Sequence, residues 1–191
     1  MSAAVALFGT SADPPTLGHQ ALLEQLLQHY PQVATWASDN PGKHHDAPLA
    51  LRAQMLDALV AHLANPRLEH RQELSSPWAI TTLERAAARW PAAQLVFVVG
   101  SDLLQQIPHW RQAPQVLQRC QVAVVPRLGW PLEPAAIATL KGLGGRVTVL
   151  ELPIPGTASS QLRQGSDPGQ IAPAAAPLVR EHNLYGLGPH C

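Results

Sequence analysis

The sequence has little charge, few cysteines and no long apolar run, and each shortage removes a class of function. Charged residues make up 14% of the 191 positions, and 13 basic side chains balance 13 acidic ones. A broad electrostatic surface for nucleic acid or anionic lipid is therefore not expected. Any phosphate group must be bound locally, by a few placed side chains.

The two cysteines, Cys120 and Cys191, have neither the spacing of a metal site nor that of a disulfide framework. We therefore expect a reducing compartment, the cytoplasm. No stretch approaches the ~20 apolar residues of a membrane-spanning helix. The N-terminal apolar segment is short and lacks a basic flank, so we interpret it as a first strand and not as a secretion signal.

What is present is a regular alternation of short apolar runs and amphipathic segments. The apolar runs predict strands at 3–8, 33–37, 95–99, 122–125 and 147–152, with a weaker one at 67–73. Helical periodicity predicts helices at 18–29, 49–63, 79–90 and 134–143, short helices at 102–107 and 112–118, and a terminal helix at 171–182.

This alternation predicts an α/β fold with a three-layer, doubly wound parallel sheet, in one domain covering residues 1–191. Ligands bind such sheets at the carboxyl ends of the strands, where the strand order reverses. We therefore expect the functional site after Gly9, which ends the first strand, and after Gly100, which ends the clearest one.

The segment from Gly9 to His19 reads GTSADPPTLGH and joins the first strand to a helix. Free N–H groups at the start of a helix favour an anion. An ordinary histidine pKa near ~6.5 lets His19 carry positive charge toward a phosphate. Thr16 offers a hydroxyl, and Gly18 lets a ligand approach the backbone. A proline-rich turn whose histidine caps or packs is the alternative interpretation.

The segment resembles the signature of the nucleotidylyltransferase superfamily, a (His/Thr)-x-Gly-His element that contacts the triphosphate of the nucleotide donor. It is most similar to the form found in nicotinate/nicotinamide mononucleotide adenylyltransferases, where Asp-Pro-Pro precedes the element. The bacterial form usually has His where this chain has Thr16, and Thr there is common in the pantetheine-phosphate branch. The resemblance implies catalytic roles for Thr16 and His19, and ATP contacts from Gly9, Thr10, Ser11, Gly18 and His19.

A second motif, TASSQLR, contains Ser159, Ser160 and Arg163. A serine N-cap with an arginine one turn later places a bidentate phosphate donor beside free N–H groups. A capped surface helix with a solvated arginine explains the same pattern. The motif resembles the second superfamily signature, Ser-(Ser/Thr)-x-(Ile/Leu)-Arg, which binds the adenylyl donor. The resemblance implies ATP binding by all three residues and a catalytic role for Arg163.

The run LVFVVGSDLLQQIPHW, residues 95–110, ends a strand in Gly-Ser-Asp and carries a tryptophan eight residues later. Asp102 can accept a hydrogen bond from a ribose hydroxyl, and Trp110 can stack on a pyridine or pack as a surface aromatic. The run resembles the Gly-(Ala/Ser)-Asp…Trp segment of bacterial nicotinate-nucleotide adenylyltransferases, whose tryptophan stacks on the nicotinate ring. The resemblance implies Gly100 and Asp102 at ATP, and Ser101 and Trp110 at the mononucleotide.

A loop and helix at 41–56 resemble the same family. Pro-Gly-Lys-His before LALRAQML is similar to its Pro-His-Lys loop and Arg-x-x-Met-Leu helix. The resemblance implies that Lys43, one of only two lysines, serves catalysis and the mononucleotide. The adjacent His44, His45 and Asp46 are not expected to hold a metal ion, because neighbouring loop histidines rarely form a site alone.

Two further segments resemble the family. SPWAITTLE is similar to its Ser-Tyr-Thr-x-Asp-Thr segment, with Trp78 in place of the tyrosine and Thr81 in place of the aspartate. The retained Thr82 is implied to contact the mononucleotide. LVREHNLY at 178–185 is similar to the closing helix and Leu-Tyr of the family.

Taken together, the resemblance implies adenylyl transfer from ATP to nicotinate mononucleotide, which forms nicotinate adenine dinucleotide and pyrophosphate in NAD biosynthesis. Mg²⁺ is expected to arrive with ATP, without a metal held by the protein. Two alternatives stay open: a sister adenylyltransferase for nicotinamide mononucleotide or pantetheine phosphate, and a nucleotide-sensing protein on the same fold that has lost catalysis. No nucleic-acid or membrane partner is expected, and a homo-oligomer is left open.

Overall fold

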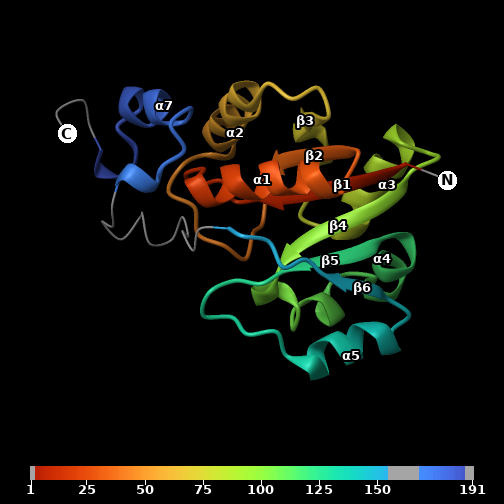
Figure 1. Cartoon of the computed structure of the whole chain (residues 1–191). Helices are drawn as coiled ribbons and strands as arrows, with labels where there is room; N and C mark the ends of the chain where they lie inside the picture. The colour runs from red at the N-terminus through yellow and green to blue at the C-terminus, as the bar shows by residue number, and fades with distance from the viewer. Residues whose placement is uncertain (1–2, 155–167, 188–191) are drawn as a thin grey trace.

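A six-stranded parallel sheet with strand order β3-β2-β1-β4-β5-β6 forms the centre of the structure (Figure 1). The structure, a computed structural model, describes residues 3–154 and 168–187. The strands are β1 (Ala4–Thr10), β2 (Gln32–Ala37), β3 (Leu68–His70), β4 (Gln94–Gly100), β5 (Gln121–Val125) and β6 (Arg146–Val149). The order reverses between β1 and β4, so the predicted doubly wound α/β fold is confirmed and its switch point lies where Gly9 and Gly100 were expected to place it.

Helices cover both faces of the sheet (Figure 1). On one face α1 (Leu17–His29) and α2 (Leu49–Leu63) pack through leucines such as Leu23 and Leu59. On the other lie α3 (Ala79–Arg89), α4 (Ala113–Arg119) and α5 (Pro134–Gly142), with Leu83 and Leu140 fully buried. Alternate residues of β5 join the two apolar clusters, which explains why its sequence is a continuous apolar run.

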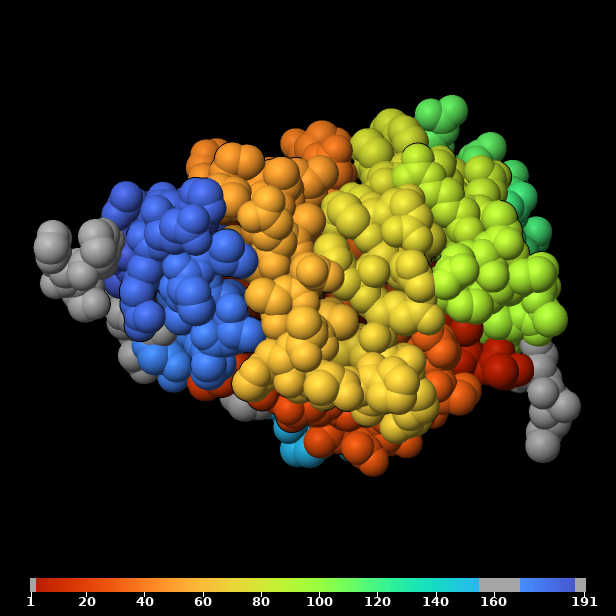
Figure 2. Space-filling model, turned by 90° about the horizontal axis from the view of Figure 1, so that it is seen from above, coloured from red at the N-terminus to blue at the C-terminus, as the bar shows by residue number. Residues whose placement is uncertain are grey.

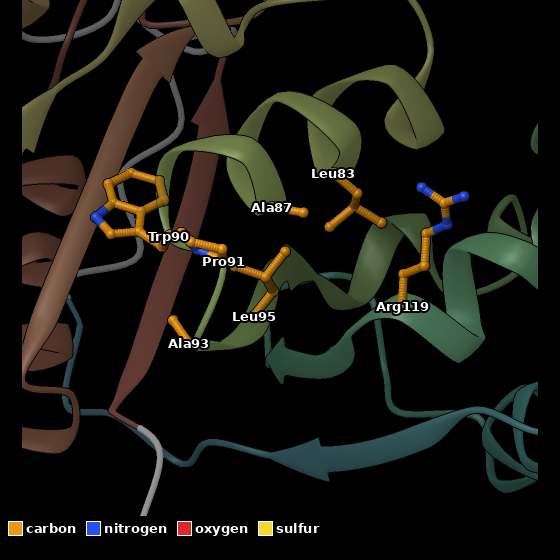
Figure 3. A pocket seen from close by; sticks show the side chains of 7 residues that line it. All are labelled: Leu83, Ala87, Trp90, Pro91, Ala93, Leu95 and Arg119. Carbon is orange, nitrogen blue, oxygen red and sulfur yellow. The ribbon is translucent and has the colours of Figure 1, made fainter.

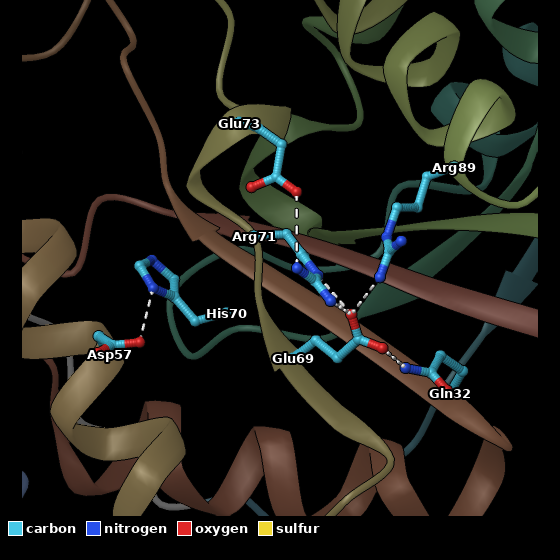
Figure 4. Close-up of polar contacts among 7 residues, drawn as sticks. All are labelled: Gln32, Asp57, Glu69, His70, Arg71, Glu73 and Arg89. Carbon is cyan, nitrogen blue, oxygen red and sulfur yellow. Dashed lines mark hydrogen bonds and ion pairs between the residues drawn. The ribbon is translucent and has the colours of Figure 1, made fainter.

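The edge strand β3 is short and carries charged side chains. Figure 4 shows Glu69 accepting from Gln32 over 2.6 Å and pairing with Arg71 and Arg89, while His70 lies 3.0 Å from Asp57. Charges on an edge strand oppose pairing with another chain. The predicted strand at 67–73 is realised only over Leu68–His70, and the 3-10 helix η1 (Gln72–Leu74) follows it.

The C-terminal segment, residues 168–187, packs beside α2 and the start of α1 (Figures 1 and 2). Ile171 pairs with Thr16 in an isolated antiparallel bridge, and the Ala172 N–H donates to the Pro15 carbonyl over 3.0 Å. The expected helix at 171–182 is shortened to α7 (Ala176–Glu181), because Pro177 fits only in the first turn of a helix.

The remaining short elements are 3-10 turns: η2 (Ser101–Leu103), η3 (Ile107–His109), η4 (Pro168–Gln170) and η5 (Leu184–Gly186). The first two replace the short helix expected at 102–107. None of the helices in the described part of the chain is long and apolar enough to cross a membrane.

Candidate functional site

His19 lies in the first turn of α1, and both of its ring nitrogens are bound. The Thr16 backbone N–H donates to Nδ1 over 3.0 Å, and the Thr16 hydroxyl lies 2.8 Å from the same nitrogen. The Thr10 hydroxyl lies 2.8 Å from Nε2. Because Nδ1 accepts from a backbone N–H, the proton of the neutral ring is assigned to Nε2, which donates to Thr10.

Thr16 is the N-cap of α1 and is fully buried. Its hydroxyl accepts from the His19 N–H over 3.3 Å, so cap and histidine form a reciprocal capping box. The hydroxyl is thus occupied within the protein, and its predicted contact with phosphate stays a prediction. The first turn of α1, which contains Gly18, is the positive end of the helix dipole, and the Nε2 donor of His19 lies next to it. Together they favour the binding of an anion at the start of α1.

The pKa of His19 is lowered from 6.5 to about 4, first by burial and second by the positive charge of Arg127. The ring is therefore neutral at pH 7. This corrects the expectation that His19 can carry positive charge, which took the ordinary pKa and could not include burial or the Arg127 cation beyond β5. A neutral ring still donates one hydrogen bond through Nε2.

The end of β4 carries a compact polar cluster. The Ser101 hydroxyl donates to the Trp130 carbonyl over 2.7 Å and accepts from the Arg127 N–H over 2.9 Å. Oδ2 of Asp102 pairs with Arg127 over 2.9 Å, while Oδ1 is buried without a hydrogen-bond partner among the described residues. A Cβ at Gly100 would lie 2.3 Å from that Oδ1. The orphaned oxygen suits a hydroxyl donor such as a ribose.

Arg127 is a site residue that the sequence analysis missed. Gly100 at the end of β4 pairs with Val125 at the end of β5. The residues that follow these two strands therefore lie side by side, and Arg127 reaches Asp102. Arg127 lies two residues beyond that strand, 43% exposed, and its charge reaches His19. A basic residue soon after an apolar run was the only sequence signal for it.

Asp13 connects three segments that are distant in the sequence. Its fully buried carboxylate accepts from the N–H groups of Asp46 and Ala47 over 2.8 and 3.1 Å. The Tyr185 hydroxyl donates to it over 2.6 Å, from 172 residues away. The turn before α1, the loop at 38–48 and the C-terminal segment therefore meet at one buried charge.

Arg52 fixes the same loop from α2. Its guanidinium donates to the carbonyls of Ser11, Ser38 and Ala47 over 2.7, 3.0 and 3.1 Å. Lys43 stays exposed in the middle of the loop, with its N–H bound to the Asn40 carbonyl over 3.1 Å. The loop that carries Lys43 is thus anchored on both sides while the ammonium group stays open to solvent.

An aromatic chain lies on the α3 side of the switch point. Trp110 packs against Phe97 with ring centroids 6.0 Å apart, and Phe97 against Trp36 at 6.3 Å. A Cβ at Gly9 would lie 2.7 Å from the Trp36 ring, so the ring itself requires glycine there. Thr82, in α3, is buried and donates to the Leu74 carbonyl over 2.9 Å.

Most of the predicted residues fall into three groups, and Lys43, Thr82 and Trp110 lie outside them. Thr10 and Thr16 are each hydrogen-bonded to the His19 ring. Ser11, with its hydroxyl 3.3 Å from His45 Nε2, lies in the same turn. Gly100, Ser101 and Asp102 form the cluster at β4. Ser159, Ser160 and Arg163 lie outside the described residues.

No group of three His, Cys, Asp or Glu side chains in residues 3–154 and 168–187 is arranged to hold a metal ion. The Nδ1 atom of His44 lies 3.3 Å from Oδ1 of Asp46, and both side chains are exposed. A hollow of about 230 Å³ between α3 and α4 lies elsewhere (Figure 3). Its lining is apolar except for Arg119, which pairs with Glu84, and it contains none of the predicted site residues.

Comparison with known proteins places the chain among nucleotidyl-transfer enzymes. The family model described as cytidylyltransferase-like matches residues 7–165. A protein of Synechocystis sp. named "Probable nicotinate-nucleotide adenylyltransferase" is 35% identical, over 95% of this chain and 98% of its own. One of the same name from Myxococcus xanthus is 30% identical, over 96% and 95%.

A solved structure has a similar fold. The structure of Plasmodium falciparum nicotinic acid mononucleotide adenylyltransferase complexed with NaAD superposes with a TM-score of 0.77, over 97% of this chain and 98% of that one. The sequence identity is 15%, so this likeness concerns the fold alone.

Proposed function

The chain belongs to the cytidylyltransferase-like family, and from this premise we propose that it is a nicotinate-nucleotide adenylyltransferase. It transfers the adenylyl group of ATP to nicotinate mononucleotide, and it forms nicotinate adenine dinucleotide and pyrophosphate in NAD biosynthesis. The names of the Synechocystis and Myxococcus relatives support the reaction and the branch. The proposal takes the 191 residues as one nucleotidylyltransferase domain.

The observation that carries the proposal is the position of His19. Its Nε2 donor lies at the start of α1, at the switch point of the sheet, within the field of Arg127. Thr10 occupies the donor at 2.8 Å, which is the distance a phosphate oxygen would take in its place. Backbone N–H groups, an imidazole donor and a guanidinium together make a local site for polyphosphate in a chain with no net charge.

The reaction needs alignment and charge stabilisation more than it needs acid–base chemistry. An oxygen of the mononucleotide phosphate is already ionised, and it attacks the α-phosphorus in line with the leaving group. The bond from that phosphorus to the bridging oxygen breaks, and the electron pair leaves with pyrophosphate. Mg²⁺ enters as part of the ATP substrate, bound by phosphate oxygens and water, and offsets part of the developing charge.

Several of the predicted residues, and Arg127, have roles in this scheme. His19, with Thr10 and the N–H groups beside Gly18, binds the phosphates of ATP and stabilises the charge that builds up on pyrophosphate. Arg127 adds positive charge from the segment that follows β5, and Asp102 accepts from a ribose hydroxyl. Further roles are phosphate binding by Lys43, Ser159, Ser160 and Arg163, and pyridine stacking by Trp110.

A pyrophosphate-release assay tests the proposal. Purified protein receives MgATP with nicotinate mononucleotide, nicotinamide mononucleotide or 4′-phosphopantetheine in separate reactions. Release with the nicotinate form as the preferred substrate is expected. Preference for another acceptor would make the protein a sister adenylyltransferase. ATP binding without release in any reaction would favour the sensor, for which Thr16 in place of the usual histidine is the motivating observation. Cytoplasmic location stays a prediction, and a homo-oligomer stays an open alternative.

A further inference from the structure

Arg111 follows Trp110 directly, in a tight turn between η3 and α4. The Ala113 N–H donates to the Trp110 carbonyl over 3.0 Å, and Gln112 has a φ of 57°. A residue with a side chain adopts this left-handed conformation only where surrounding structure fixes it, and such positions concentrate at functional sites. The turn therefore sets where the Arg111 side chain leaves the backbone beside Trp110.

The guanidinium of Arg111 stacks on Trp78. The Arg111 Cζ lies 5.3 Å from the centroid of the Trp78 ring. Trp78 immediately precedes α3 and is 46% exposed. Stacking uses the face of the guanidinium and leaves the N–H donors on its edge open. No ion pair among the described residues uses Arg111. An exposed, positioned cation without a carboxylate partner thus lies next to the aromatic chain of Trp110.

We propose that Arg111 selects the acid form of the pyridine mononucleotide by binding the carboxylate of the ring, while Trp78 holds the guanidinium in place. The inference rests on the proposed function, because it takes Trp110 as the platform for the pyridine. A carboxylate accepts two parallel hydrogen bonds from a guanidinium. A carboxamide has one acceptor oxygen, and its NH₂ group would face the donors of Arg111. The charge and the fork of Arg111 therefore both favour nicotinate over nicotinamide.

Substitution of Arg111 tests this selection. Arg111→Gln is expected to raise the KM for nicotinate mononucleotide about tenfold, which corresponds to one charge-assisted hydrogen-bonded contact, with a smaller change in kcat. The ratio of kcat/KM for the acid over the amide should fall by a similar factor. Arg111→Lys keeps the positive charge but loses the paired N–H donors of the guanidinium. Its acid-over-amide ratio should therefore lie between those of the wild type and Arg111→Gln. Trp78→Leu, which removes the stacking surface, should also lower the ratio.

Arg146→Gln is the matched control. Arg146 is also exposed, and it belongs to no ion pair of the described residues. It is the first residue of β6, so it lies at the amino ends of the strands, whereas the site lies at their carboxyl ends. This variant should keep the wild-type ratio. Calorimetric Kd values for the two mononucleotides, measured without ATP, give the same ratio independently of turnover.

The outcomes separate the inference from the function on which it rests. An unchanged ratio in Arg111→Gln, or an equal loss for acid and amide, overturns the inference while pyrophosphate release upholds the function. Binding that prefers the acid through Arg111, in a protein that releases no pyrophosphate, supports the inference and overturns the function. Wild-type protein that binds neither mononucleotide overturns both.

Discussion

The backbone N–H of Thr16 donates to Nδ1 of His19 over 3.0 Å, and this contact decides which ring nitrogen keeps the proton. Donor and acceptor are three residues apart, so the turn that begins α1 sets the tautomer by itself. The Nε2 proton then faces Thr10 across 2.8 Å. A phosphate oxygen that displaces the Thr10 hydroxyl meets a donor whose orientation is already fixed.

Thr16→Val separates the two contacts of Thr16. The variant loses the hydroxyl that caps α1 but keeps the backbone N–H that sets the tautomer. We expect the free energy of unfolding to fall by about 1–2 kcal/mol, as for other lost N-caps. The kcat should fall roughly tenfold, because the His19 ring is held by one contact fewer. Denaturant unfolding and pyrophosphate release measure both. Thr16→Ser should restore both values, and a valine variant as stable as wild type would contradict the capping role.

Gly100→Ala tests the polar cluster at the end of β4. The new Cβ would lie 2.3 Å from Asp102 Oδ1 and 2.6 Å from Arg127 Cδ, so the ion pair must shift. We expect kcat/KM to fall more than tenfold, because the charge of Arg127 and the acceptor of Asp102 both move. Gly142→Ala is the control, since an added Cβ there meets nothing within 4 Å. The control should keep full activity, and equal activity in both variants would contradict the role of the cluster.

Tyr185→Phe tests whether the C-terminal segment holds the Lys43 loop through Asp13. The variant removes the hydrogen bond of 2.6 Å to a buried carboxylate and should lower the free energy of unfolding by about 1.5–3 kcal/mol. The KM for the substrates should rise as the loop loses an anchor. Tyr30→Phe is the control, because Tyr30 is the other tyrosine of the chain and its hydroxyl makes no hydrogen bond among the described residues. Similar losses in both variants would argue against the anchor.

The lowered pKa of His19 predicts an acid-sensitive fold. The folded pKa is about 4 and the ordinary one 6.5, so between these values the unfolded chain binds a proton that the folded protein does not. The stability from the neutral ring is therefore complete above pH 6.5 and is lost as the pH falls toward 4. His19→Gln should flatten this part of the stability curve in denaturant unfolding. Arg127→Gln should raise the pKa of His19, and an NMR titration of the His19 ring measures this pKa. A wild-type His19 that titrates near 6.5 would contradict the burial effect.

The strands that form the site were predictable, because buried parallel strands are continuous apolar runs. The ends of β1 and β4 could be located before their neighbours were known, since Gly9 and Gly100 follow such runs directly. Arg127 could not be found in this way. It becomes a site residue only because β5 pairs with β4, and strand order is not readable from local sequence.

The same limit applies to Asp13. Its carboxylate was part of a recognised motif, but its partner Tyr185 lies 172 residues away. The length of the terminal helix was overestimated for a local reason. Periodicity extended the expected helix toward the N-terminus, beyond Pro177 to Ile171, but Ile171 pairs with Thr16 instead. The charge of His19 was missed because a pKa depends on burial and on cations brought from elsewhere in the fold.

The most direct measurement is steady-state pyrophosphate release with MgATP and nicotinate mononucleotide, for wild type and His19→Ala side by side. The wild type should turn over, and the kcat of the variant should be at least ~10²-fold lower, as for the loss of a donor that acts in the transition state. Circular dichroism should show that the variant keeps its fold. A variant within fivefold of wild type would contradict the role of His19, and a wild type without release would contradict the proposed reaction itself.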